Sequence, residues 1–273
     1  MSFDFAALAT IAGKEFWDRI RSLWVLAIAL LFTVFALAIA YFGGAQQGAV
    51  GFRSMELTIA SLVSLVIYLI PLIALLLGFD AIVGERERGS LDLLLSLPIT
   101  RSELLLGKYA GLAGALAFST IAGFGLVAVV LSTRVSLAGL AAYAGFMASS
   151  LLLGCAFLSV AVLISVFAAD RTRASGLAIA VWFFFVLLFD LLLLGLLVVG
   201  GGQAGGSALP FLLLLNPADV FRVINMHALE EVGALYGLAT VFPPQLADAA
   251  LLYGVLVGWC VVPLGVAAWR FRR

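Results

Sequence analysis

The stretch VGERERGSLDLLLSLPITRSELLLGKY, residues Val83 to Tyr109, decides how this chain folds. It sets arginines, acids and a proline among leucines, between two long apolar runs, Leu57 to Val83 and Leu104 to Leu131. A hydrocarbon layer of roughly 30 Å needs about 20 apolar residues per helix. The flanking runs therefore predict two membrane-spanning helices joined by a short charged loop.

The same argument extends over the whole chain of 273 residues, of which 64% are hydrophobic and 11% are charged. Only helices or closed barrels satisfy their backbone in lipid, and continuous apolar runs exclude the alternation of barrel strands. We expect an all-α polytopic membrane protein, one permease-like domain over residues 1–273. Because 23 residues precede the first run, cleavage as a signal peptide is not expected. The six predicted spans are Trp24 to Tyr41, Leu57 to Val83, Leu104 to Leu131, Leu140 to Phe167, Ala174 to Val199, and Ala249 to Trp269.

The distribution of basic residues predicts the orientation of these spans. Three basic residues, Arg53, Arg134 and Arg222, fall in the loops of one side. The other side carries all the rest, and cytoplasmic loops are the ones enriched in lysine and arginine. Both termini and the loop of residues 84–103 are therefore expected in the cytoplasm, which the formal net charge of zero conceals.

Residues 1–23 have the pattern of an amphipathic helix that lies in the membrane surface. Polar residues, among them Lys14, Asp18 and Arg21, lie opposite an apolar stripe. Lys14 with Asp18, and Glu15 with Arg19, stand four residues apart and are predicted to form ion pairs. The stripe consists of Phe5, Leu8, Ala12, Phe16, Ile20 and Leu23.

The loop of residues 84–103 predicts one short helix from Leu91 to Leu97, with Ser90 as its N-cap and Pro98 as its end. Thr100 and Glu103 form the capping box of the third span. Three leucines of the short helix share one face, with Asp92 opposite. Such a short helix is marginal alone and needs something to dock on: lipid, the bundle or another protein. The three leucines are Leu91, Leu94 and Leu95.

This loop, followed by LLLGKY, resembles the permease subunits of type-2 ABC exporters. The resemblance covers nearly the whole chain and extends to Ala12 to Leu26, Gly84 to Arg101 and Leu215 to Asn225. It is similar in particular to the permeases that serve maturation of nitrous oxide reductase, a copper enzyme of denitrification. The resemblance implies a homodimer in a bacterial inner membrane, with six spans and a cytoplasmic coupling helix.

The chain contains no phosphate-binding sequence GxxxxGK[ST], so it is not expected to be an enzyme or to bind a cofactor. The resemblance implies that a separate ABC ATPase subunit holds ATP and magnesium. The alternatives are a solvated loop whose charges only fix the topology, and a contact at the turn Asp170 to Arg173. The residues expected to couple to the ATPase are Glu85, Arg86, Glu87, Arg88, Leu91, Asp92, Leu94, Leu95, Leu97 and Arg101.

The loop of residues 200–248 is predicted to lie in the periplasm. A glycine-rich linker and a short apolar run precede Asn216, the predicted N-cap of a helix with Asp219 in its first turn. The resemblance implies that a periplasmic protein binds this loop; the alternative is a re-entrant segment without a partner. The candidate contacts are Asn216, Asp219, Phe221 and Arg222.

Asp190, in the fifth span, is the candidate for a transport path, because an intramembrane carboxylate normally faces a cavity or a partner. It also supports a competing function, an ion-coupled secondary transporter, although no internal repeat is found. Asp80 is expected to meet Arg86 and Arg88. No metal site is predicted: His227 lacks further ligands. Cys155 and Cys260 are interpreted as small apolar side chains that fill space in their spans, or as thiols that face a sulfur species. An intramembrane enzyme is not indicated, because the sequence shows no paired nucleophile and base.

Overall fold

The computed structural model describes residues 4–42, 55–132, 137–199, 209–227 and 248–272, which form helices joined by short turns, with no β-strand among them. The predicted all-α class is confirmed. The elements are α1 (Phe5–Ile20), α2 (Leu23–Phe42), α3 (Met55–Gly78), α4 (Val83–Glu87), α5 (Ser90–Leu95), α6 (Arg101–Ser132), α7 (Leu137–Phe167), α8 (Arg171–Phe183), the π-helical segment η2 (Phe184–Leu188), α9 (Phe189–Val199), α10 (Leu209–Leu213), α11 (Pro217–His227) and α14 (Ala249–Arg272).

Within the described residues, five helical segments are long and apolar enough to cross a membrane, and they correspond to the last five predicted spans. The first predicted span coincides with α2, but its apolar part within the described residues, Ala27–Ile39, is shorter. A sixth span stays a prediction. The five segments are Thr58–Glu87, Arg101–Val130, Gly139–Phe167, Arg171–Leu196 and Ala249–Arg272.

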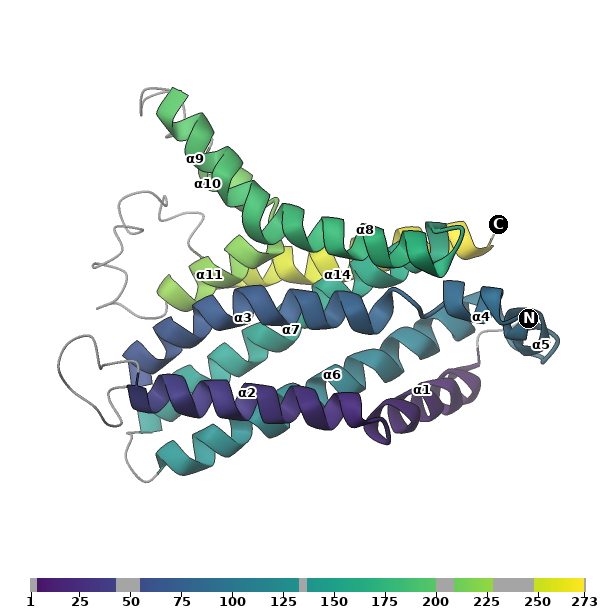
Figure 1. The fold of residues 1–273 in the computed structure, drawn as a ribbon, viewed down its shortest axis with the longest axis horizontal. Helices are drawn as coiled ribbons and strands as arrows, with labels where there is room; N and C mark the ends of the chain where they lie inside the picture. Colours follow the sequence, from purple (N-terminus) through teal and green to yellow (C-terminus); the bar gives the residue numbers. More distant parts are fainter. Residues whose placement is uncertain (1–3, 43–54, 133–136, 200–208, 228–247, 273) are drawn as a thin grey trace.

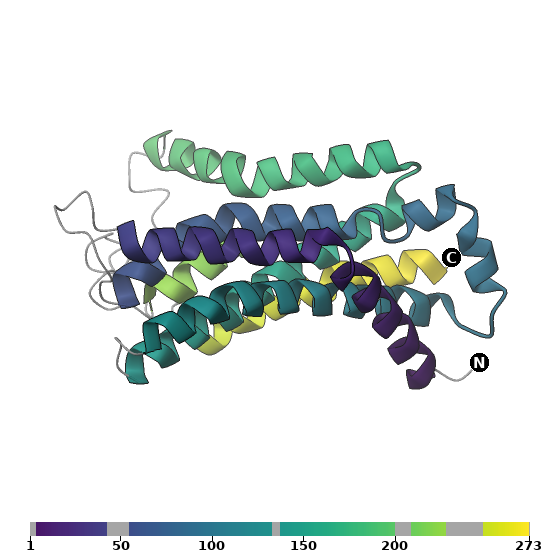
Figure 2. The same ribbon diagram turned by 60° about the horizontal axis from the view of Figure 1, so that its bottom comes forward.

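The described ends of α1 and α14 lie at one end of the bundle, together with α4, α5 and the turn between α7 and α8 (Figure 1). We call this the basic end, because it holds the cluster of lysines and arginines expected on one side of the membrane. Helix α1 runs away from the axis of α2 there, as Figure 2 shows. The predicted helix within residues 1–23 is present, whereas its place in a membrane surface stays a prediction.

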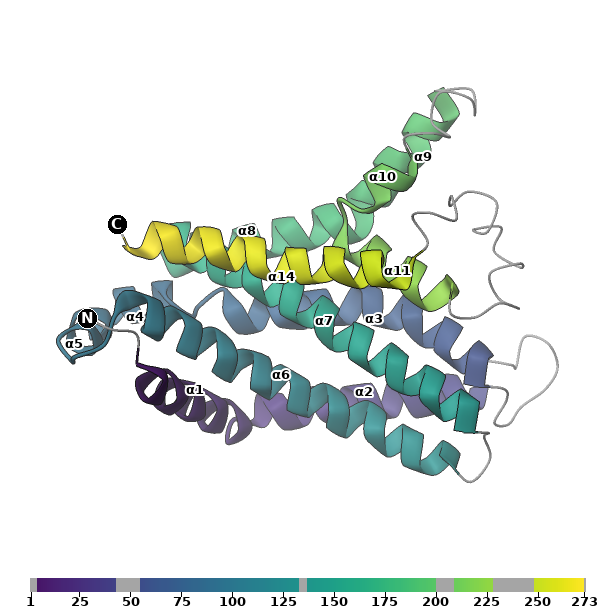
Figure 3. The ribbon, with the colours of Figure 1, turned by 180° about the vertical axis from the view of Figure 1, so that it is seen from behind.

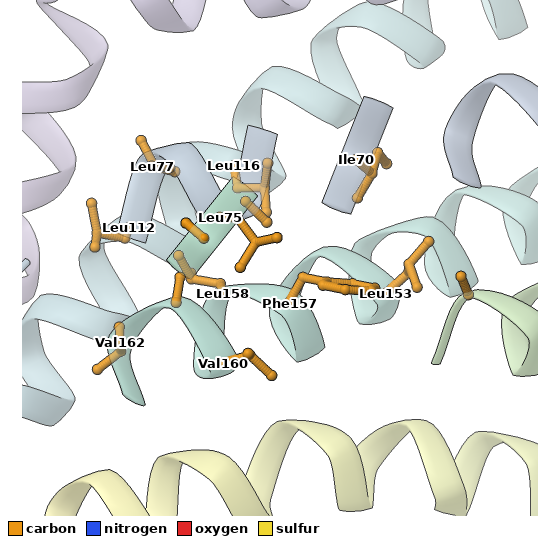
Figure 4. Close-up of a cluster of buried hydrophobic side chains, with 14 of the residues drawn as sticks. Ile70, Leu75, Leu77, Leu112, Leu116, Leu153, Phe157, Leu158, Val160 and Val162 are labelled. Carbon is orange, nitrogen blue, oxygen red and sulfur yellow. The ribbon is translucent and has the colours of Figure 1, made fainter. Parts of the chain in front are cut away.

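Helix α7 is central: it packs along α3 and along α14, while α6 packs along α1 and α2 (Figure 3). Leucines and aromatic residues of α3, α6 and α7 fill the space between them, among them Leu75, Leu116 and Phe157, none of them more than 2% exposed (Figure 4). This packing holds the two helices that flank the charged loop, α3 and α6, in a fixed relation to α7.

Helix α6 approaches α1 closely because it carries glycines on that face. A Cβ built on Gly111 would lie 2.6 Å from the backbone oxygen of Ala12, and one on Gly107 would lie 2.8 Å from Ile11. Gly107 and Gly111 thus allow the two helices to approach each other closely. By contrast, no heavy atom lies within 4 Å of the corresponding position at Gly258, so the glycines of α14 make no such contact in this protomer.

The fifth span is not a regular helix. The π-helical segment η2 separates α8 from α9, and α9 diverges from the rest of the bundle (Figure 1). A π-helix bonds each N–H to a carbonyl five residues back and is typical of functional sites. Apolar side chains along α8 and α9 remain exposed, including Ile179, Phe183 and Leu191.

Candidate functional site

The predicted loop helix exists as α5, and its leucines divide between two faces. Leu91 is buried, Leu94 and Leu95 are half-buried, and Asp92 is exposed, as expected. Leu93 is 72% exposed and Leu97, beyond the helix end, is 54% exposed. Leu93 was missed, because a helix of six residues presents more than one leucine-bearing face. We call Asp92, Leu93, Ser96 and Leu97 the outer face of α5.

The ends of α5 differ slightly from the expectation. Helix α5 begins at Ser90, and its N-cap is Gly89, whose φ of 70° only glycine adopts readily. It ends at Leu95 with Ser96 as C-cap, two residues before the expected end. The capping box of α6 is confirmed: the Thr100 N–H donates to Glu103 at 2.7 Å, and the Glu103 N–H donates to Thr100 Oγ1 at 3.2 Å.

Beneath α4 and α5 lies a buried ion cluster of one lysine and two glutamates. The ammonium nitrogen of Lys108 on α6 is 2.6 Å from Glu15 Oε1 on α1 and 2.9 Å from Glu85 Oε1 on α4. The Lys108 side chain is only 5% exposed. Glu85 also accepts a hydrogen bond from the Ser90 hydroxyl at the start of α5. The cluster therefore ties α1, α4, α5 and α6 together.

The predicted pair of Glu15 with Arg19 is not formed, because Glu15 turns inward to Lys108. No ion pair joins Arg19 to a described residue. The predicted pair of Lys14 with Asp18 is present at 3.3 Å on the surface. The sequence analysis assigned Lys108 no role beyond topology. The signal that could have found it is a lysine at the fifth position of the predicted span that begins at Leu104.

Two arginines expected to meet the ATPase instead bond to this chain. Arg86 Nη1 donates to the Ala168 carbonyl at 3.0 Å, at the end of α7. Arg101 donates to the Phe271 carbonyl at 3.1 Å and its guanidinium lies over the Phe271 ring. They fasten the loop to the C-terminal ends of α7 and α14, where exposed carbonyls favour cations.

Glu87 and Arg88 belong to a second network, centred on Asp80. Glu87 Oε1 accepts a hydrogen bond of 2.7 Å from the Arg171 backbone N–H, so α4 is linked to the start of α8. Asp80 meets Arg171, with Nε 2.7 Å from Oδ1 and a hydrogen bond of 3.0 Å from Nη2 to Oδ2. Arg88 is 3.9 Å from Asp80, whereas Arg86 is turned away.

The helix α11 has the predicted start. Asn216 is its N-cap, accepting from the Ala218 N–H at 3.0 Å, and Pro217 is its first residue. The Asn216 amide also donates to the Phe185 carbonyl of η2 at 2.8 Å. Asn216, Asp219 and Phe221 are no more than 1% exposed. These three side chains therefore pack inside the protomer, and their contact with a periplasmic protein stays a prediction.

Asp190 has the cationic partner that the sequence argument did not find. Arg222 of α11 donates to Asp190 Oδ2 at 2.9 Å and to Asp219 Oδ1 at 2.6 Å. The basic residue comes from the loop, not from a span, and lies 32 positions away. The Arg222 guanidinium thus bonds to two carboxylates, one on α9 and one on α11. A carboxylate held in this way is a structural clamp between α9 and α11, which weakens the case for an ion-carrying Asp190.

The electrostatics of α11 follow from burial. Desolvation raises the pKa of the Asp219 carboxyl to about 7. The attraction of Arg222 opposes this rise, but that guanidinium is shared with Asp190, whose charge pushes the Asp219 pKa upward.

His227 is the last residue of α11, and residues 200–208 and 228–247 of the predicted periplasmic loop lie outside the described residues. Cys155 and Cys260 are both free thiols, and Cys260 contacts the Leu152 carbonyl. No group of three or more metal-ligating side chains is found in the described part of the chain.

The sequence matches the family described as ABC-2 family transporter protein over residues 9–273. It is 46% identical over 270 residues to a Pseudomonas aeruginosa protein named probable ABC transporter permease protein NosY, and the match covers 97% of each chain. A Stutzerimonas stutzeri protein of the same name is 46% identical over 267 residues, covering 96% of this chain and 97% of that one. The family resemblance predicted from the loop is confirmed.

Proposed function

Because the chain belongs to the ABC-2 family of transporter proteins, we propose that it couples ATP hydrolysis on a separate ATPase subunit to transport or conformational work across a bacterial inner membrane. The observation that carries this proposal is the outer face of α5. Two large leucines, Leu93 and Leu97, are exposed at the basic end, on a short helix that projects from the bundle (Figure 1). An exposed apolar helix face at a charged surface fits a groove on a partner protein.

The ATPase acts in trans. The sequence has no phosphate-binding loop, so ATP and magnesium belong to the partner, which we propose is similar to NosF. Glu85, Arg86, Glu87 and Arg101 act indirectly, because they hold α4 and α5 to the bundle. Asp92, Leu93 and Leu97 make the contact itself.

The way in which α5 is anchored supports a mechanical role. The Lys108 cluster connects α5, through Ser90 and Glu85, to both α1 and α6. A push on α5 is therefore transmitted to two helices at once, and α6 is among the longest in the bundle. The tilt of α6 and α3 changes the far end of the bundle, where a substrate leaves or a partner changes shape.

The setting of this work is proposed from the relatives. We place the basic end in the cytoplasm on the positive-inside argument. The named relatives support a role in copper-site assembly of nitrous oxide reductase, with a NosD-like periplasmic protein on the far side. A homodimer is proposed from the membership of the chain in the ABC-2 family. The ATP-driven change moves a sulfur species or copper across the membrane, or it performs conformational work on a partner without moving a substrate.

The decisive experiment is co-purification of the tagged full chain with a NosF-like ATPase from the same organism. We expect Leu93→Glu and Leu97→Glu to abolish the complex, because each places a charge in an apolar contact. The matched variants Leu93→Met and Leu97→Met keep the apolar surface and should retain the ATPase. Thr172→Glu, which adds the same charge in the first turn of α8, should also retain it.

If both glutamate variants keep the ATPase bound, α5 is not the docking helix. Loss of the complex in Thr172→Glu alone would move the contact to the turn Asp170 to Arg173. These readings require equal amounts of each variant in the membrane, measured by immunoblotting.

A further inference from the structure

A groove of about 310 Å³ lies near the basic end, bordered by α1, α2, α3 and the start of α8. Its lining is mainly apolar and includes Ile28 of α2 together with Ile73 and Leu76 of α3. Leu76 is 42% exposed although it lies in a predicted span. Helix α3 contributes Ile73, Leu76 and Leu77 to the lining and forms the apolar floor of the groove; it lies between α2 and the α8–α9 segment (Figure 2).

Two arginines stand in the lining of this groove, Arg19 from α1 and Arg171 from α8. Arg171 is bound to Asp80, which neutralises that carboxylate, and its side chain is still 50% exposed. Arg19 makes no ion pair within the described residues, because the acid one turn earlier, Glu15, is taken by Lys108. The two guanidiniums and the one acid leave a net positive charge in the lining.

The groove thus combines cationic groups at the basic end with an apolar floor inside a predicted span. Trp17, exposed on α1 two residues before Arg19, is of a type enriched at membrane–water interfaces, which supports a position of Arg19 at the level of lipid headgroups. An occupant must therefore carry negative charge joined to an apolar chain. An anionic phospholipid has both in one molecule, and juxtamembrane arginines attract such lipids.

We propose that this groove is a binding site for one anionic phospholipid of the surrounding membrane. Its phosphate lies between Arg19 and Arg171, and one acyl chain runs along Ile73 and Leu76 of α3. The site is distinct from the outer face of α5 and from the buried Lys108 cluster. Because it joins the end of α1 to the start of α8, bound lipid fixes two elements that contact each other little otherwise.

The test is native mass spectrometry of the delipidated full chain, titrated with dioleoyl phosphatidylglycerol or with dioleoyl phosphatidylcholine. We expect one phosphatidylglycerol per chain to be retained in preference to phosphatidylcholine. Arg19→Gln should weaken phosphatidylglycerol binding roughly fivefold, the effect of removing one cation near an anionic surface. Arg21→Gln, which removes the same charge outside the groove, should bind like the parent chain.

A second variant tests the apolar half of the site. Leu76→Trp fills the groove and should displace phosphatidylglycerol, while Val261→Trp, at an exposed position of α14, should not. If Leu76→Trp lowers the melting temperature, the Arg19→Gln comparison decides, because Arg19 has no buried partner to lose.

Three results would overturn the proposal: equal binding of the two lipids, equal effects of Arg19→Gln and Arg21→Gln, or unchanged phosphatidylglycerol binding in a folded Leu76→Trp variant. If Leu76→Trp instead separates dimers without changing lipid binding, the groove is covered by a second copy of the chain and the lipid site is wrong.

Discussion

The ammonium nitrogen of Lys108 lies 2.6 Å from the Glu15 carboxylate, although the two residues are 93 positions apart in the sequence. Lys108 also contacts Glu85 of α4, so two acids share one cation in a nearly buried position. Buried charges need partners, because leaving one uncompensated costs several kcal/mol. The arrangement makes Lys108 the common anchor of α1, α4 and α6, directly beneath the proposed docking helix.

We expect Lys108→Met to destabilise the chain by about 3–5 kcal/mol, since it leaves Glu15 and Glu85 without their cation. The measurement is the midpoint of thermal unfolding in detergent, with tryptophan fluorescence as the signal. Lys14→Met is the control: the Lys14–Asp18 pair is exposed on the same helix α1, and its loss should cost about 0.5 kcal/mol or less. Equal shifts for the two variants would show that the cluster contributes nothing beyond an ordinary surface pair.

The two faces of α5 predict opposite consequences of the same substitution. Leu91 is buried against the bundle, so Leu91→Ala should lower stability by about 2 kcal/mol or more. Leu93 is exposed, so Leu93→Ala should change stability by no more than about 0.5 kcal/mol. The affinity for the ATPase should reverse this order, with Leu93→Ala the weaker binder. Parallel losses of stability and affinity in both variants would argue that α5 has no separate outer face.

Stability should depend on pH through Asp219. Burial raises the pKa of this carboxyl from 3.8 to about 7, so the folded chain holds the proton more tightly than the unfolded chain. Its contribution is fully present below about pH 4 and is lost as the pH rises toward 7. As the pH rises from about 4 to 7, the thermal midpoint of Asp219→Asn should rise relative to that of the parent chain, because only the parent chain loses this contribution. Asp92→Asn is the exposed control and should not reproduce this trend; a constant difference for Asp219→Asn would contradict the assignment.

Local signals in the sequence predicted local structure well. The capping box of Thr100 and Glu103 and the N-cap Asn216 depend on residues three positions apart or fewer, and both are present. Continuous apolar runs predicted six spans, and five of them are matched in the described residues by helices long and apolar enough to cross a membrane. These features need no knowledge of tertiary contacts, because backbone hydrogen bonds and lipid set them within a single segment.

The long-range ion pairs were not predictable in the same way. Asp80 was expected to meet Arg86 and Arg88, and it also meets Arg171 across 91 positions. No partner was predicted for Asp190, which meets Arg222 across 32 positions. Which basic residue lies next to each carboxylate depends on how α8, η2 and α11 pack. The burial of Asn216, Asp219 and Phe221 was missed for the same reason, since the start signals of α11 do not tell whether it lies on the bundle or within it.

The contact between α6 and α1 gives a last prediction, at Gly111. A methyl group there would lie 2.6 Å from the Ala12 carbonyl oxygen and 2.6 Å from the Glu15 Cβ. Backbone cannot yield as a flexible side chain does, so Gly111→Ala must push α1 away from α6 and with it Glu15 away from Lys108. We expect a lower thermal midpoint, with a cost of about 1–3 kcal/mol, and weaker retention of the ATPase. Gly258→Ala is the matched control, because no heavy atom lies within 4 Å of its new methyl group, and it should be neutral or slightly stabilising. Unchanged stability and unchanged ATPase binding in Gly111→Ala would mean that α1 is not held against α6 and that the Lys108 cluster does not connect them.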